Sequence, residues 1–172
     1  QRSGEVVYDR AGSAISEAGP GTFDWPRLLE GAAWLHVTGI TPALGPGVAE
    51  ATREAVEAAR AAGARVSIDL NYRRKLWTQR EAQTVMRPLA SRAHLLVANE
   101  EDLQSCLGVE VRGADVASAA LEVAGYREAA ERVSRALGAE LVAITLRESF
   151  SASRNGWSAV LWDAQAAAFH EG

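Results

Sequence analysis

The sequence is poor in cysteine and has no long uninterrupted apolar run. Its one cysteine, Cys106, cannot form an internal disulfide, which favours a reducing compartment, so we expect a cytoplasmic protein. The apolar stretches are short, and one of them, from Ala139 to Leu146, is broken by Glu140. We therefore expect no transmembrane span and no membrane partner.

Several motifs with well-understood chemistry are also missing. The sequence has no Gly-x-x-x-x-Gly-Lys-Ser/Thr phosphate loop, no Gly-x-Gly-x-x-Gly turn after a strand, and no Gly-x-Ser-x-Gly elbow. Its three histidines, His36, His94 and His170, lack the spacing of metal ligands. The net charge of −4 offers little attraction to a phosphate backbone, so nucleic acid is excluded as a partner.

The composition that remains is that of one globular domain. The chain has 172 residues, of which 48% are hydrophobic and 23% charged, enough for one sizeable core. The first residue is Gln1, not Met, and a strand-like run from Glu5 to Tyr8 begins almost at once. The last four residues, 169–172, stop without a closing helix. We interpret both ends as cuts inside a larger fold.

Strand-like and helix-like segments alternate along the chain. The expected strands are Glu5–Tyr8, Trp34–Val37, Arg65–Leu70, His94–Ala98, Leu141–Leu146 and Trp157–Trp162. The expected helices follow Asp24, span Gly47–Ala62, begin after the capping pair of Thr78 and Glu81, run from Asn99 to Leu107, and include Tyr126–Leu137. Strands separated by helices predict an α/β fold with a mainly parallel sheet, right-handed crossovers, and helices on both faces. We expect residues 1–20 to form a small β lid and residues 21–172 the core.

In such sheets ligands bind beyond the carboxyl ends of the strands. Gly39 follows the first core strand, where it either permits close backbone approach or breaks the strand in a turn. After the next strand, alternation puts Asp69, Asn71 and Arg73 on one side of an extended segment. An acid, an amide and a guanidinium there suit an anionic ligand, although Asp69 could instead form a surface salt bridge with Arg73 or Arg74.

Other polar residues follow the remaining strands. Asn99 is suited to cap a helix, and acids in its first turn, including Asp102, complement the helix dipole. The same amide and carboxylate could also organise phosphate, water and Mg²⁺. Thr145 could approach a nucleotide or belong to a solvated loop. Tyr8 and Arg10 share one face of the first strand and could hold a sugar acid or lie on an exposed edge.

Five of these segments together resemble the ribokinase (PfkB) family of carbohydrate kinases, most of all the 2-keto-3-deoxygluconate kinases. They are Tyr8–Ala14 (YDRAGSA), His36–Leu44 (HVTGITPAL), Asp69–Arg73 (DLNYR), Asn99–Asp102 (NEED) and Thr145–Glu148 (TLRE). The likeness runs from Tyr8 to Trp162, and the five segments occur in the family's order. It implies a three-layer α/β/α sandwich of ribokinase type and transfer of the γ-phosphoryl group of ATP to a sugar hydroxyl.

The resemblance also implies roles for single residues. Tyr8, Arg10 and Ile40 would contact the sugar acid, and Arg73 would lie near both the substrate and the transferred phosphoryl group. The residues implied to lie near the nucleotide, with Mg²⁺ as cofactor, are Asn71, Asn99, Thr145 and Arg147. Asp102 would act on the metal through water. Lid strands often pair across a dimer in this family, so a homodimer through the exposed edge from Glu5 to Arg10 is possible.

Departures from the family pattern leave other readings open. Asp102 stands where the family usually has Glu, and Arg147 where many relatives have Gly. The Gly-rich anion hole and the catalytic Asp normally follow the last strand, but the chain stops at Gly172 before such a motif. We therefore expect the 172-residue chain itself to be inactive. The parent could also be a 5-dehydro-2-deoxygluconate kinase, a fructokinase, or a non-catalytic α/β ligand-sensing module.

Overall fold

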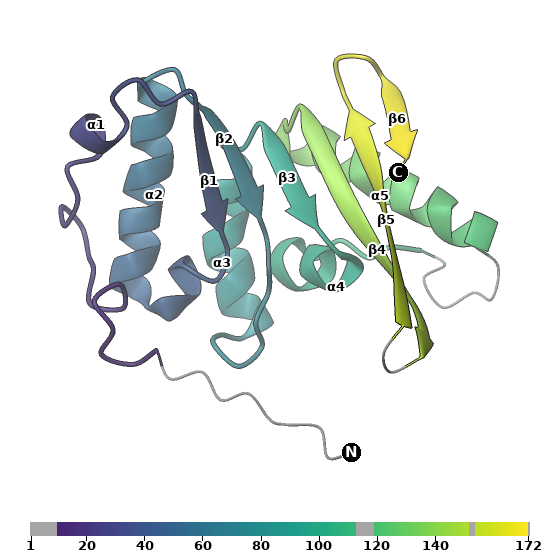
Figure 1. Ribbon diagram of the computed structural model, residues 1–172, viewed down its shortest axis with the longest axis horizontal. Helices are drawn as coiled ribbons and strands as arrows, with labels where there is room; N and C mark the ends of the chain where they lie inside the picture. Colours follow the sequence, from purple (N-terminus) through teal and green to yellow (C-terminus); the bar gives the residue numbers. More distant parts are fainter. Residues whose placement is uncertain (1–9, 113–118, 152–153, 172) are drawn as a thin grey trace.

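A six-stranded mixed sheet is the centre of the molecule. The computed structural model describes residues 10–112, 119–151 and 154–171. The strands are β1 (Trp34–Thr38), β2 (Arg65–Asp69), β3 (Leu95–Ala98), β4 (Leu141–Ser151), β5 (Arg154–Asp163) and β6 (Ala168–Glu171). They lie side by side in chain order, β1 to β6 (Figure 1). The expected strand from Glu5 to Tyr8 lies outside the described residues, and the described part of the proposed lid, residues 10–20, forms turns and no strand.

The first four strands are parallel, and the last two pair antiparallel. β1 pairs with β2, β2 with β3 and β3 with β4 in parallel, while β5 and β6 continue as a meander. The α/β, mainly parallel prediction is therefore confirmed. The segment between the expected strands Leu141–Leu146 and Trp157–Trp162 is mostly strand, because β4 continues to Ser151 and β5 begins at Arg154. Backbone pairing between β4 and β5 therefore extends both strands beyond the ends expected from the sequence.

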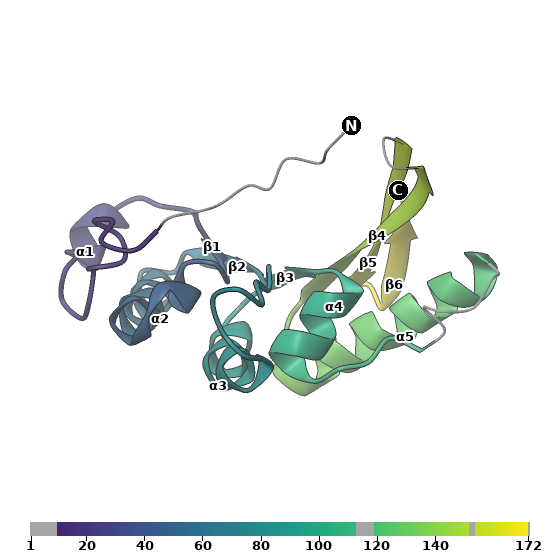
Figure 2. The same cartoon turned by 90° about the horizontal axis from the view of Figure 1, so that it is seen from below.

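The helices of the crossovers all lie on one face of the sheet (Figure 2). They are α2 (Pro46–Ala61), α3 (Gln79–Ala90), α4 (Glu100–Asp102) with the π-helical turn Leu103–Leu107, and α5 (Ala119–Leu137). This placement follows from handedness: successive right-handed crossovers that always step in the same direction across a sheet return on the same side. A short α1 (Trp25–Leu28) and a 3₁₀ turn (Pro42–Leu44) flank β1. A helical layer on the second face is not found among the described residues.

Local sequence signals explain why these helices begin where they do. Thr78 caps α3 through a complete capping box with Glu81, as the spacing predicts. Asn99 caps α4 in the same way with Asp102. Asp24 accepts a hydrogen bond from the Arg27 backbone at the start of α1. The predicted helix starts at Asp24, Thr78 and Asn99 are thus confirmed.

The main core lies between the sheet and this single helical layer. Val56, Ile68, Met86, Leu96 and Ile144 each have 0% exposure and belong to one continuous cluster. The opposite face of β1 and β2 is more open: Trp34 is 44% exposed, and its indole N–H donates to Ser67 Oγ at 2.8 Å. Side chains therefore alternate between a dry face and a partly exposed one.

Candidate active site at the carboxyl ends of the strands

Strand register brings the carboxyl ends of β1, β2, β3 and β4 to one edge of the sheet. Thr38 lies opposite Asp69, Asp69 opposite Val97, and Val97 opposite Ala143. The polar residues that follow these positions therefore leave the sheet side by side. We call this edge the carboxyl rim, and define it by Thr38, Asp69, Asn71, Arg73, Asn99, Asp102 and Thr145.

The exits of β1 and β2 are joined by a side-chain contact. Asn71 Nδ2 donates to Thr38 Oγ1 at 2.9 Å, and the Asn71 backbone has a φ of +41°, in the left-handed region. Gly39 N–H donates to the Asp69 carbonyl at 2.8 Å. A Cβ on Gly39 would lie 2.0 Å from the Leu70 carbonyl oxygen, so only glycine permits this approach. Of the two roles considered for Gly39, the structure shows the close backbone approach.

Asp102 joins the exits of β2 and β3. Its carboxylate accepts the Tyr72 backbone N–H at 2.7 Å on one oxygen and the Asn99 N–H at 3.1 Å on the other. The Asp102 backbone N–H in turn donates to Asn99 Oδ1 at 2.8 Å. Asp102 is 5% exposed, so these bonds hold a buried carboxylate between two chain segments. The expected role of Asp102 at the start of the helix is therefore observed. The carboxylate also holds the loop that carries Asn71 and Arg73.

The electrostatics of the rim combine two acids with one arginine. Burial raises the pKa of Asp69 and of Asp102 above the usual carboxyl value. The positive charge of Arg73 lowers both pKa values and so offsets part of this rise. The pKa of Asp69 is also lowered by His36 and by a hydrogen bond from the Asn71 backbone. Arg73 is exposed, and its Nη1 donates to the Tyr72 carbonyl at 2.8 Å. Its guanidinium is thus held near both acids while facing solvent.

The rim continues to β4. Thr145 Oγ1 donates to the Ala98 carbonyl at 3.4 Å, which places Thr145 beside the turn that begins at Asn99. Arg147 lies further along β4, opposite Trp157, but its side chain is outside the described part of the structure. The structure therefore brings Asn71, Arg73, Asn99, Asp102 and Thr145 to one edge, as the strand-end rule predicts.

The residues expected to contact the sugar are less well defined. Tyr8 is outside the described residues. Arg10 begins a turn in which its carbonyl accepts the Ser13 hydroxyl at 2.8 Å. Ile40 is partly buried in the turn after β1. Their roles stay predictions.

Two hollows in the described part of the molecule bear on the position of the site. The larger, about 520 Å³, lies between α2 and α3 and is lined by residues such as Arg53 and Leu89, away from the rim. The smaller, about 230 Å³, lies beside β1 and reaches Thr38 and Thr41. Of these two, the smaller adjoins the rim at Thr38, the residue whose hydroxyl accepts a hydrogen bond from the Asn71 side-chain amide.

A resident metal site built from protein ligands alone is not present in the described segments. No group of three or more His, Cys, Asp or Glu side chains there could hold an ion. Mg²⁺ usually binds through one or two carboxylates together with substrate phosphates and water. Both Asp102 oxygens already accept backbone N–H groups, so the rim fits an arrangement in which a nucleotide would bring most of the ligands and Asp102 would act through water. In the same described segments, no helix has the length and apolar character to cross a bilayer.

Comparison with known proteins gives one consistent result. A 2-dehydro-3-deoxygluconokinase from Thermotoga maritima superposes with a TM-score of 0.88 and is 44% identical, over 99% of this chain and 49% of its own. A PfkB family carbohydrate kinase from Listeria grayi is 27% identical with a TM-score of 0.75, over 97% of this chain and 48% of its own. This chain carries part of the PfkB-type carbohydrate kinase fold. The predicted resemblance is thereby confirmed.

A curated relative agrees with the structural matches. A 2-dehydro-3-deoxygalactonokinase from Haloferax volcanii is 36% identical over 124 residues, which is 72% of this chain and 38% of that protein. No family model matches the sequence. The chain thus spans about half the length of the solved kinases and less of the curated one.

The sequence analysis did not identify two residues that connect the segments of the carboxyl rim. Thr38 accepts the Asn71 amide, and Tyr72 donates its backbone N–H to Asp102. No local signal marks either contact, because the partners are 33 and 30 positions apart. The strand-end rule could have selected Thr38 as the last residue of β1.

Proposed function

We propose that the protein containing this chain transfers the γ-phosphoryl group of ATP to a hydroxyl of a sugar acid of the 2-keto-3-deoxy-aldonate class. The observation that carries the proposal is the continuous rim in which Asn71, Arg73 and Asn99 leave neighbouring strands together. Likeness to kinases named for 2-dehydro-3-deoxygluconate and 2-dehydro-3-deoxygalactonate supports the substrate class. 2-Keto-3-deoxygluconate is the substrate we favour.

Phosphoryl transfer depends mainly on alignment and on stabilising charge over the phosphoryl oxygens. In the proposed mechanism Arg73 supplies that charge, because its guanidinium faces solvent beside the half-buried Asp69 and the buried Asp102. The Asn71 amide is held by Thr38 and orients the same phosphoryl group. Bound Mg²⁺ would supply further charge neutralisation on the nucleotide phosphates.

The remaining residues have supporting roles in this proposal. Asn99, Thr145 and Arg147 border the nucleotide, and Tyr8, Arg10 and Ile40 border the sugar acid. Asp102 holds the loop between Asn71 and Arg73, and any effect on Mg²⁺ passes through water. A general base must still accept the hydroxyl proton, and we propose that it comes from chain beyond these 172 residues. The chain alone is accordingly expected to show no turnover, and the protein is expected in the cytoplasm.

The test is an ADP-release assay on the natural-length protein with ATP and Mg²⁺. The acceptors to compare are 2-keto-3-deoxygluconate, 2-keto-3-deoxygalactonate, 5-dehydro-2-deoxygluconate and fructose. We expect turnover of a 2-keto-3-deoxy acid in preference to fructose. A clear preference for fructose would overturn the acid assignment, and no turnover with any acceptor would favour a ligand-sensing module.

Arg73 and its neighbour Arg74 form a matched pair of exposed arginines for this assay. Removing one donor to a charged transition state usually lowers the rate by about 10²- to 10³-fold. Arg73→Met is expected to lose activity on that scale, whereas Arg74→Met should stay within about threefold, because the proposal gives Arg74 no contact with the phosphoryl group. Equal effects of the two substitutions would contradict the role assigned to Arg73.

A further inference from the structure

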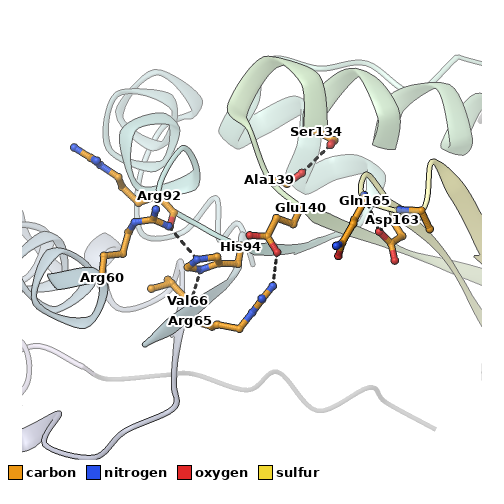
Figure 3. A network of polar contacts seen from close by, with 11 residues as sticks. Arg60, Arg65, Val66, Arg92, His94, Ser134, Ala139, Glu140, Asp163 and Gln165 are labelled. Carbon is orange, nitrogen blue, oxygen red and sulfur yellow. Dashed lines mark hydrogen bonds and ion pairs between the residues drawn. The ribbon is translucent and has the colours of Figure 1, made fainter. Parts of the chain in front are cut away.

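Figure 3 shows a polar network of Arg60, Arg65, His94 and Glu140. It lies where β2, β3 and β4 begin, so it is at the opposite end of these strands from the carboxyl rim. Its centre is His94, immediately before β3. Arg60 reaches it from the last turn of α2, and Arg65 is the first residue of β2. Glu140 directly precedes β4 and forms an ion pair with Arg65 at 2.5 Å. None of these groups belongs to the proposed phosphoryl-transfer site.

His94 connects three strands through its backbone and its ring. Its N–H donates to the Val66 carbonyl at 2.8 Å, and its carbonyl accepts the Leu141 N–H at 2.9 Å. The Val66 N–H donates back to Nδ1 of the His94 ring at 2.9 Å. The Arg92 carbonyl, two residues earlier, accepts Nη1 of Arg60 at 2.9 Å. The imidazole thus serves as the acceptor for the Val66 N–H where β2 and β3 begin.

These contacts determine the protonation state of the ring. A backbone N–H can only donate, so Nδ1 must carry no proton. A neutral ring therefore carries its proton on Nε2, which lies 3.4 Å from Arg60 Nη1, another obligate donor. A second proton would place an N–H on Nδ1 directly against the Val66 N–H. It would also add a cation beside Arg60 and Arg65, with Glu140 as the opposing acid.

We propose that His94 is a proton-sensitive latch, which joins the start of β3 to β2 while it is neutral and releases that contact when it is protonated. Burial lowers the pKa of His94 first of all, and Arg60 and Arg65 lower it further, whereas Glu140 and the Val66 backbone oppose them. The unfolded chain then binds a proton more readily than the folded one. Stability conferred by the latch is complete above the unfolded histidine pKa of about 6.5, and it declines as the pH falls towards the lowered folded value.

His94→Asn is the matched variant for a test. The asparagine Oδ1 is attached to Cγ as Nδ1 is, so it can accept the Val66 N–H, yet it does not titrate. Urea unfolding of both proteins is followed by circular dichroism from about pH 8 to about pH 5. The unfolding constant of the wild type, divided by that of the variant, is expected to rise by up to about tenfold per pH unit below pH 6.5. A ratio that stays constant over this range would overturn the proposal.

A second measurement needs no variant and remains decisive if His94→Asn does not fold. The His94 ring proton signals of the folded wild type are followed by NMR as the pH is lowered. We expect a midpoint below that of histidine in the urea-unfolded chain, together with loss of hydrogen-exchange protection at the Val66 amide. A midpoint equal to or above the unfolded value, or a Val66 amide that stays protected after the ring is protonated, would refute the latch.

Discussion

The substitution Asp102→Asn tests whether one buried carboxylate holds the rim together. The wild-type oxygens accept the Tyr72 and Asn99 backbone N–H groups at 2.7 and 3.1 Å. Asparagine has one acceptor oxygen, so one of these N–H groups would face an amide NH₂. Leaving a buried donor without an acceptor costs about 1–3 kcal/mol. A neutral side chain avoids the burial penalty that raises the Asp102 pKa, so the net loss we expect is about 1–2 kcal/mol.

Glu101→Gln is the control for this substitution. Glu101 is exposed and lies in the same first turn of α4, so both variants remove one favourable charge from the helix start. Urea unfolding at neutral pH should separate Asp102→Asn from this control by about 1 kcal/mol or more. Hydrogen exchange at the Tyr72 amide should quicken only in Asp102→Asn. Equal stability of the two variants, with Tyr72 still protected, would show that the carboxylate does not hold the loop.

Three further outcomes are expected. Gly39→Ala should destabilise the fold by more than about 2 kcal/mol, because the added Cβ would lie 2.0 Å from the Leu70 carbonyl oxygen. Gly63→Ala has open space around its Cβ but a φ of +79°, so it should cost about 1 kcal/mol. Urea unfolding curves measure both losses. Burial raises the folded-state pKa of Asp69, so the charged carboxylate destabilises the fold above that pKa. This destabilisation vanishes below the pKa of Asp69 in the unfolded chain. In urea titrations, Asp69→Asn should therefore be more stable than the wild type at pH 7 and equally stable near pH 3. Burial also raises the pKa of the Cys106 thiol to about 12. This thiol should therefore react with a disulfide reagent at pH 8 only after unfolding, because the thiolate is the reactive form. Rapid reaction of the folded protein would contradict the burial of Cys106.

The sequence was sufficient to predict the elements whose signals are local. Capping pairs, such as Thr78 with Glu81, marked helix starts correctly because both partners lie within one turn. The strand-end rule then selected the edge where Asn71 and Asn99 meet, since parallel strands in register end together. Family resemblance added an expected chemistry, but it did not indicate which contacts hold these residues in place.

Contacts between neighbouring strands could not be predicted in the same way. The Thr38–Asn71 bond requires both the β1–β2 register and a left-handed φ at Asn71, and neither property is encoded in a short motif. The length of the β4–β5 hairpin was also underestimated, because strand pairing depends on the partner more than on the composition of each strand. The single helical layer follows from the order of the strands, which the sequence pattern left open.

Agreement between strand order and chain order has a consequence for how the molecule assembles. Trp34 lies opposite Arg65 and Ser67 opposite Leu95, so each of these crossovers closes a loop of only about 30 residues. Each new unit can dock on the one made just before it, with no need for a distant partner to be synthesised first. On the ribosome, the described strands are therefore expected to join one another in the order β1 to β6 as this part of the nascent chain emerges.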